Sequence, residues 1–258
     1  MLCGFFIMCI FFTVVYDKLV TVLRSITNDY IFLYRVRKSK KKYMVRAEFF
    51  HLKRAYCGIQ KLLDSYEFSS ILDVGCGDGQ HCEMFKLYQK KVTAIDYGNS
   101  TYFQKNSGMI KAVVGDYNKH TFCRKFDCVW VSHVLEHQVN AHLFLKKVCE
   151  DLKENGVLAI TVPPLKFNIV GGHVNLFNSG LLLYRLILAG FDCNDAKLLE
   201  YSNNITVLVR KKRIDIDDRI VYDSGDIKML KKYFPQAIQK SISDGDSFNG
   251  DIEEINWC

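Results

Sequence analysis

The sequence predicts an α/β protein built on one doubly wound sheet. Two observations lead to this fold class: short apolar runs alternate with segments of helical periodicity, and a cluster of glycines follows the first apolar run. The size and composition are consistent with a folded domain, because 258 residues with 49% hydrophobic and 24% charged side chains can bury a substantial core. No internal repeat is visible, and only three prolines interrupt the pattern.

The expected elements follow one another in a regular order. Helical spacing of apolar residues is seen in residues 47–66, 83–91, 142–156 and 179–191. Apolar runs that we expect to form seven strands span residues 69–73, 91–96, 111–117, 126–132, 156–164, 196–202 and 205–212. Strands and helices that alternate in this way form a doubly wound sheet.

The loop after the first strand reads ILDVGCGDGQ, residues 71–80. In a doubly wound sheet, a ligand binds at this position, and glycines let the backbone approach it closely. A dinucleotide loop has the spacing G-x-G-x-x-G, whereas here Gly75, Gly77 and Gly79 alternate and Gln80 follows. Asp73 would repel a pyrophosphate, but its carboxylate suits the cationic amino end of S-adenosylmethionine.

At these residues the sequence resembles the class I S-adenosylmethionine-dependent methyltransferases, whose first motif is an acidic residue followed by G-x-G-x-G. The resemblance extends from about Phe68 to Lys212. It implies a seven-stranded, Rossmann-like methyltransferase sheet with S-adenosyl-L-methionine as the cofactor. It also implies the residues that hold this cofactor: Asp73, Gly75, Cys76, Gly77, Gly79, Asp96, Tyr97, Asp116, Tyr117 and Ser132.

Individual roles come from the same resemblance. Asp96, at the end of the second strand, is expected to accept hydrogen bonds from the ribose hydroxyls. Asp116 is expected to accept from the adenine amino group, with Tyr117 beside the ring. The alternative for each aspartate is an ordinary turn or cap residue.

Three histidines are candidate catalytic residues. The segment SHVLEHQVN, residues 132–140, follows the fourth strand, and related methyltransferases of the ubiquinone type carry V-L-E-H there. His133 is expected to face the methyl donor as a base for the acceptor proton, with His137 one turn further on. His173, in the loop GGHVNLF, is a second candidate base or acceptor contact. Packing or capping roles for these histidines, and a mobile lid without chemistry, remain the alternatives.

The spacing His133-x-x-Glu136-His137 also matches the H-x-x-E-H signature of inverted zinc proteases. That interpretation leaves the glycine loop and Asp96 unexplained. We predict no metal requirement from the sequence, because the carboxylates of a catechol-type magnesium site are not evident.

The sequence divides into three parts. Residues 47–213 contain the alternating strands and helices, residues 1–46 form an apolar segment with a basic linker before them, and residues 214–258 follow them. Residues 1–16 carry no charge, and the apolar stretch is just long enough for a membrane anchor or a membrane-surface helix. The alternative is a buried helix of a soluble protein. Residues 35–42 hold six cations, which suit a contact with anionic lipid or nucleic acid, or a solvated basic linker, and the apolar run before them favours lipid. By the positive-inside rule we expect the following domain on the cytoplasmic side. Residues 214–258 are expected to lie outside the sheet, as a small cap over the acceptor cleft or a dimer contact. The alternative is a partly disordered extension.

The function predicted from these features is enzymatic methyl transfer to a small-molecule or glycan acceptor, at an oxygen, at the cytoplasmic face of a membrane. A methyltransferase for RNA or protein is one alternative, although no N-P-P-Y-type motif follows the fourth strand and nucleic acid is disfavoured. A non-catalytic binding protein is another, but no glycine or acid of the motif is lost. The ten scattered cysteines are expected to be reduced thiols, and no oligomeric state is predicted.

Overall fold

The computed structural model describes most of the chain after the apolar N-terminus. The described residues are 26–27, 29–31, 33–105, 110–214, 216, 220–223, 225–242 and 246–257. The chain divides into two compact units, Met1–Val45 and Arg46–Cys258.

In the first unit, residues 33–42 are helical. The apolar helix expected in residues 1–23 lies outside the described residues. Within the part of the chain that is described, no helix has both the length and the apolar character needed to cross a membrane.

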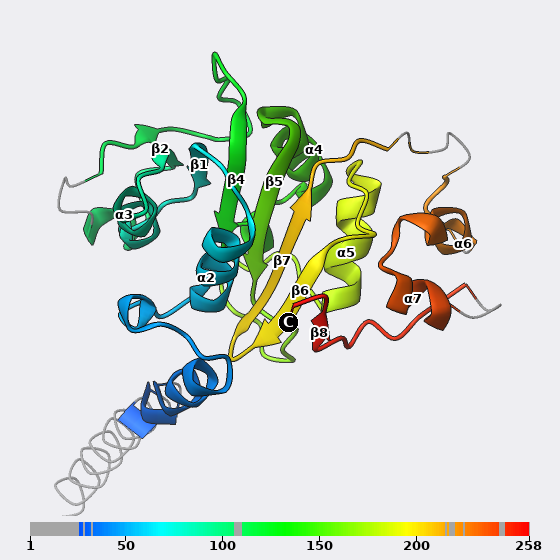
Figure 1. The fold of residues 1–258 in the computed structure, drawn as a ribbon, viewed down its shortest axis with the longest axis horizontal. Coiled ribbons are helices and arrows are strands. Elements are labelled where there is room, and N and C mark those ends of the chain that lie inside the picture. Colours follow the sequence, from blue (N-terminus) through cyan, green and yellow to red (C-terminus); the bar gives the residue numbers. More distant parts are fainter. Residues whose placement is uncertain are drawn as a thin grey trace, which may run out of the picture. The chain divides into compact units, whose positions relative to one another are not determined.

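The second unit is organised around one eight-stranded sheet, in the order β3-β2-β1-β4-β5-β7-β6-β8 (Figure 1). Five neighbouring strands are parallel: β3 (Val113–Val114), β2 (Lys91–Asp96), β1 (Ser70–Val74), β4 (Phe126–Ser132) and β5 (Leu152–Val162). Three pair antiparallel: β7 (Asn204–Arg210), β6 (Lys197–Tyr201) and β8 (Glu254–Ile255). The central strands β1, β4 and β5 are nearly all buried, as expected when helices cover both faces of a parallel sheet.

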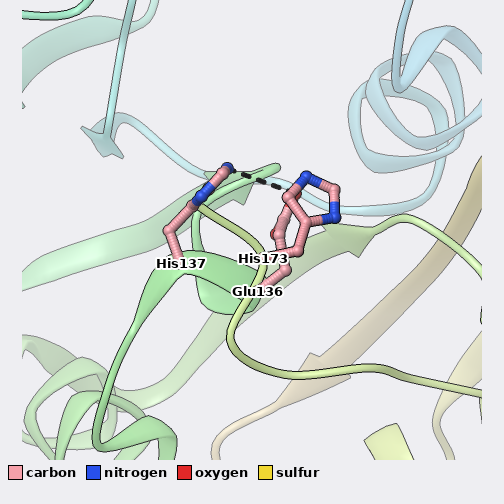
Figure 2. Close-up of side chains that lie close together, drawn as sticks. All are labelled: Glu136, His137 and His173. Carbon is pink, nitrogen blue, oxygen red and sulfur yellow. Dashed lines mark ion pairs between the residues drawn. The ribbon is translucent and has the colours of Figure 1, made fainter. Parts of the chain in front are cut away.

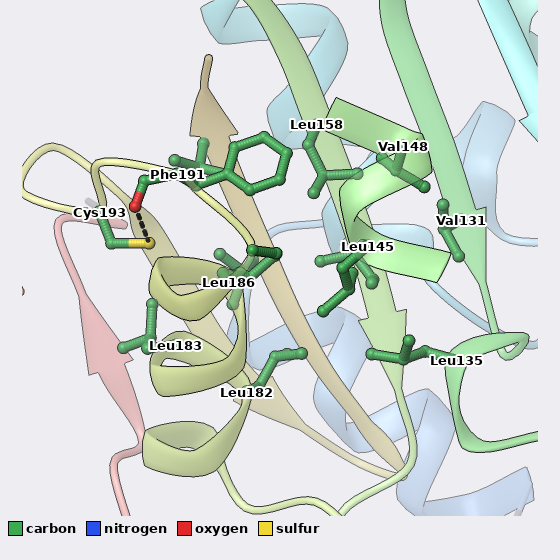
Figure 3. Packing of buried hydrophobic residues seen from close by; sticks show 14 of the residues in the cluster. Val131, Leu135, Leu145, Val148, Leu158, Leu182, Leu183, Leu186, Phe191 and Cys193 are labelled. Carbon is green, nitrogen blue, oxygen red and sulfur yellow. Dashed lines mark hydrogen bonds between the residues drawn. The ribbon is translucent and has the colours of Figure 1, made fainter. Parts of the chain in front are cut away.

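Helices lie on both faces of the sheet, as the alternating pattern predicts. The longer ones are α2 (Tyr56–Ser65), α3 (Gln80–Leu87), α4 (Ala141–Asp151) and α5 (Ser179–Leu188). Val129 and Val131 of β4 belong to the core that α4 and α5 cover (Figure 3). Trp130 points to the other face, where it packs edge-on against Phe85 of α3. Successive side chains of a strand point to opposite faces, so one strand serves both cores.

The structure corrects the sequence prediction at the C-terminal segment. Residues 214–258 were expected to lie outside a seven-stranded sheet, but β8 pairs with β6 and adds an eighth strand. Ile255 and Trp257 are buried, which attaches this segment to the domain. The segment also holds two short helices, α6 (Asp226–Leu230) and α7 (Gln236–Ser241).

Candidate cofactor and acceptor site

The glycine loop turns sharply at the end of β1. Gly75, Gly77 and Gly79 have φ values of 73°, 54° and 86°, in the left-handed region that favours glycine. A Cβ atom on Gly75 would lie 2.4 Å from Val134 Cγ2, so this position also has no room for a side chain. The loop therefore presents bare backbone and touches the segment that follows β4.

Asp96 ties this loop to the end of β2. Its Oδ2 accepts a hydrogen bond from the Gly77 N–H at 2.9 Å, and its Oδ1 accepts from the Gly98 N–H at 3.0 Å. A carboxylate oxygen has two lone pairs, so each oxygen can accept one further hydrogen bond. Asp96 is thus fixed by the loop and still able to receive two hydroxyl donors.

Asp73 lies beneath the loop. It is 1% exposed, and the Cys82 thiol donates to its Oδ2 at 3.0 Å. Burial raises the pKa of this carboxyl group to about 7. Cys76, within the loop, is also buried. The Asp73 side chain thus joins the end of β1 to α3.

The adenine-side candidates separate into two groups. The Tyr97 hydroxyl donates to Asp116 Oδ1 at 2.9 Å, which joins the ends of β2 and β3. Burial opposes ionisation of Asp116, but hydrogen bonds from Tyr97 and Asn118 outweigh it and lower its pKa. Tyr117, by contrast, packs edge-on against Phe144 and donates to Asp151. The structure therefore places Tyr117 in the core, away from Asp116.

His133 follows Ser132, the last residue of β4, in a left-handed conformation with φ of 56°. Backbone strain of this kind clusters at functional sites. Its ring Nε2 lies 3.0 Å from Asn204 Oδ1, and its Nδ1 lies 3.3 Å from Glu136 Oε1. Both ring nitrogens are thus occupied by protein groups, which makes His133 a less accessible base than the sequence suggests.

His137 and His173 are brought together by the loop after β5 (Figure 2). Their rings meet edge to face, with centroids 4.9 Å apart. The His137 Nδ1–H donates to the Gly172 carbonyl at 2.8 Å, since a carbonyl can only accept. Burial lowers the pKa of His173, which favours its neutral imidazole. The His137 side chain is 44% exposed, compared with 11% for His133.

Glu136 is the residue of the site that the sequence assigned to no role in methyl transfer. Its side chain is 1% exposed, and neither carboxylate oxygen receives a hydrogen bond from the described residues. Its backbone carbonyl accepts from the N–H groups of Val174 and Asn175, so it also holds the loop. The spacing His133-x-x-Glu136-His137 was the feature of the sequence that could have indicated a role for Glu136 in the site.

The helical arrangement of an inverted zinc protease is not formed. Residues 135–137 make a single 3-10 turn, η3 (Leu135–His137), and His133 precedes this turn with its ring directed toward Asn204. The two histidines therefore do not share one face of a helix.

The loop fits the methionine and ribose portions of S-adenosylmethionine. It offers glycine backbone free of side chains, and Asp96 retains acceptor capacity for vicinal hydroxyls. The helix α3 begins directly after Gly79, and the N–H of its first residue, Gln80, donates to Asp78 Oδ1 at 3.3 Å.

Comparison with known proteins agrees with this geometry. Residues 72–160 match the family model for a methyltransferase domain. The ubiquinone biosynthesis O-methyltransferase of Rickettsia prowazekii is 28% identical over 140 residues, which are 52% of this chain and 51% of that protein. The enzyme of the same name from Bradyrhizobium diazoefficiens is 30% identical over 97 residues, 35% of this chain and 38% of that protein. The chain thus spans about half or less of the length of these curated relatives.

A solved structure shows the same fold over a larger part of the chain. The 1,6-didemethyltoxoflavin-N1-methyltransferase of Burkholderia thailandensis, with bound 1,6-didemethyltoxoflavin and S-adenosylhomocysteine, superposes with a TM-score of 0.50. It is 17% identical, and the match covers 76% of this chain and 90% of that one. The domain match, the sheet order and the glycine loop together support a class I S-adenosylmethionine-dependent methyltransferase domain around residues 72–160.

Proposed function

We propose that the chain transfers a methyl group from S-adenosylmethionine to an oxygen of a small-molecule or glycan acceptor. One observation carries this proposal: the backbone of Gly75 packs against Val134, so the cofactor loop touches the segment that bears Glu136 and His137. A methyl donor held by the loop would therefore lie beside the histidine cluster. The name of the two relatives, ubiquinone biosynthesis O-methyltransferase, supports a small-molecule acceptor and attack by oxygen.

The residues of the chain would contribute mainly by binding and orientation. When bound, S-adenosylmethionine supplies an electrophilic methyl group on a sulfonium, and in-line displacement depends on positioning of the acceptor. Asp96 would hold the ribose hydroxyls, and the loop would enclose the methionine portion. His137 and His173 are the accessible imidazoles that can contact the acceptor oxygen or take up its proton.

The first test is binding of the cofactor. Calorimetric titration of the full chain with S-adenosylmethionine and with S-adenosylhomocysteine is expected to give micromolar dissociation constants, and NADH serves as the negative ligand. Asp96→Ala removes the acceptor of the ribose hydroxyls, and we expect a loss of about 2 kcal/mol of binding free energy.

Asp195→Ala is the matched control, because Asp195 is an exposed aspartate that pairs with Lys212 and takes no part in the glycine loop. It should leave the dissociation constant unchanged. Equal binding by the parent and the Asp96→Ala variant would remove Asp96 from the site. Absence of binding by the parent would overturn the proposed function.

The acceptor is tested by turnover. The full chain is incubated with S-adenosylmethionine and panels of phenols, nucleotide-linked sugars, lipid-linked glycans, RNA and peptides, and formation of S-adenosylhomocysteine is measured. Turnover confined to hydroxyl-bearing small molecules or glycans supports the proposal. Turnover on RNA or protein alone would mean that the acceptor is a macromolecule and not a small molecule or glycan. Cofactor binding without any turnover would favour a non-catalytic protein.

The proposal includes a contact between residues 1–42 and an anionic membrane surface. It is supported by the uncharged run of residues 1–16 and by the six cations of residues 35–42. Flotation with vesicles of phosphatidylcholine, with and without phosphatidylserine, tests it against a chain that begins at Arg46. Equal recovery of both chains with anionic vesicles would remove the membrane contact.

A further inference from the structure

We propose that Glu136, His137 and His173 form a binding site for one divalent transition-metal ion of the zinc class. One ligand atom from each residue lies within 4.8 Å of the other two (Figure 2). Two of the three come from η3, and the third comes from the loop after β5. His137 and Gly172, the neighbour of His173, are 35 residues apart in sequence, yet the two segments bring their side chains together.

Glu136 provides the first reason for a cation at this point. Its carboxylate is 1% exposed, and none of the described groups donates a hydrogen bond to Oε1 or Oε2. Burial of an ionised carboxylate without donors is strongly unfavourable. Buried charges are therefore normally paired or coordinate metals. Two imidazole nitrogens, His133 Nδ1 and His137 Nε2, lie 3.3 Å and 3.9 Å from Glu136 Oε1.

The hydrogen bond of His137 provides the second reason. Because Nδ1–H donates to the Gly172 carbonyl, the neutral ring keeps its lone pair on Nε2, which lies 3.9 Å from Glu136 Oε1. A metal-ligating histidine almost always donates its other N–H to a carbonyl or carboxylate in this way. The tautomer of His137 is thus fixed in the form that binds a metal.

The loop that carries His173 is also held in place. The N–H groups of Val174 and Asn175 donate to the Glu136 carbonyl, and the Asn175 side chain donates to the Gln138 carbonyl at 2.6 Å. These bonds anchor the loop to η3 and to the residue that follows it. Ligand atoms of one zinc ion lie roughly 3 to 3.5 Å apart, so the three side chains need to close by about an ångström.

The ligand types indicate which metal would bind. Two imidazoles and one carboxylate suit zinc and its transition-metal neighbours, whereas magnesium prefers oxygen ligands throughout. Three protein ligands leave at least one position open, as in catalytic zinc sites. The His137 side chain is 44% exposed, so the cluster can be reached from solvent.

The rival occupant is a proton. Asn204 Oδ1 accepts from the Ala55 N–H, which assigns this atom as the amide oxygen and makes His133 Nε2 the donor to it. In the neutral ring His133 Nδ1 then carries a lone pair toward Glu136 Oε1, 3.3 Å away. A proton on Nδ1 would pair the two groups without any metal, and the test separates these outcomes.

A bound metal would lie next to Val134 and therefore beside the cofactor loop. There it would bind and polarise the acceptor oxygen, a role that rests on the proposed function. Metal binding itself does not depend on methyl transfer. Zinc binding without S-adenosylmethionine binding would overturn the function alone, and the reverse result would overturn the metal site alone.

The test uses the full chain after dialysis against a chelator. Competition with a chromophoric chelator is expected to show one equivalent of Zn²⁺ bound with submicromolar affinity, and Co²⁺ should give visible absorption bands typical of a low-coordinate site. Mg²⁺ is expected to compete poorly. The variants His173→Gln and His137→Gln should each weaken zinc binding by about 100-fold or more, since loss of supporting groups alone costs 10-fold to 100-fold.

His142→Gln is the matched control, because His142 is a partly buried histidine of α4, outside the cluster. It should bind zinc like the parent. Circular dichroism confirms that the variants are folded, and His173, on a surface loop, is the substitution least able to disturb the core. No stoichiometric zinc in the parent would overturn the proposal and leave the proton on His133 as the partner of Glu136. Zinc binding that survives both substitutions would overturn it as well and assign the metal to cysteines instead.

Discussion

Gly75 is the residue at which the cofactor loop meets the acceptor segment. Its backbone has φ of 73°, and the space that a Cβ atom would need is filled by Val134. The Gly75→Ala substitution would add backbone strain and a steric overlap with the Val134 side chain. Each typically costs about 1 to 3 kcal/mol. We expect the free energy of unfolding to fall by about 3 kcal/mol in chemical denaturation.

Gly171→Ala provides the comparison, because a Cβ atom at Gly171 would meet no other atom within 4 Å and the backbone there is not left-handed. Its free energy of unfolding should stay within about 0.5 kcal/mol of the parent. Equal stability of the Gly75→Ala variant would mean that Val134 can move away, and the close contact would lose its significance.

Asp73 is expected to make stability depend on pH. Its pKa is raised from 3.8 to about 7 by burial, so the folded state holds a proton that the unfolded state has released. The contribution of this group to stability is complete below about pH 4 and is lost as the pH rises through about 7. Relative to Asp73→Asn, the parent should lose on the order of 2 to 4 kcal/mol between about pH 4 and pH 8.

The contribution of Asp127 to the free energy of unfolding should change with pH in the opposite direction. Burial opposes its ionisation, but hydrogen bonds from Lys153 and Ser70 outweigh burial and lower its pKa. Its contribution is present above about pH 4 and is lost as the pH falls. Urea denaturation of both Asp→Asn variants from about pH 2 to about pH 8 measures the two trends. Parallel curves for the parent and Asp73→Asn would contradict the assignment.

Single residues also show how far sequence reasoning reaches. The spacing of Asp73, Gly75 and Asp96 located the loop and the carboxylate beside it, because these positions depend on local turns and on strand ends. The direction in which individual side chains point was harder to predict from the sequence. Tyr117 follows Asp116 but points into the core, and no local pattern indicates that Asp151 will accept its hydroxyl hydrogen bond.

Among the elements, β8 forms one edge of the sheet. It covers the outer edge of β6, and unpaired edges invite association with other chains. Two residues are too few for a periodic pattern, so the alternation that predicted the longer strands could not reveal this one. Its pairing is instead fixed by tertiary packing of Ile255 and Trp257.

Ile255→Ala should therefore destabilise the domain. The side chain is 6% exposed within the main core, and its truncation is expected to cost about 2 to 4 kcal/mol. Asp251→Ala, at an exposed position of the same segment, should cost less than about 0.5 kcal/mol. Thermal unfolding of the two variants makes the comparison, and equal melting temperatures would show that β8 adds little to the fold.

At the scale of the whole molecule, the chain divides before Arg46. The Arg46 guanidinium pairs with Asp64, and its backbone N–H donates to Gln60, so the first residue of the second unit is bound to α2. A chain that begins at Arg46 should fold and bind S-adenosylmethionine with a dissociation constant within about threefold of the full chain. A loss of binding beyond about tenfold in calorimetry would mean that the first unit takes part in the site.

The position of β8 along the chain has a consequence for biosynthesis. When the ribosome has synthesised the chain as far as Ser241, strands β1 to β7 have been made and are leaving the exit tunnel. The strand that covers β6, β8, has not yet been made. The nascent domain would then expose β6 as an open edge while its core is largely formed. Chaperone contact at this stage, or a pause in translation, should determine how much of the newly made protein escapes aggregation.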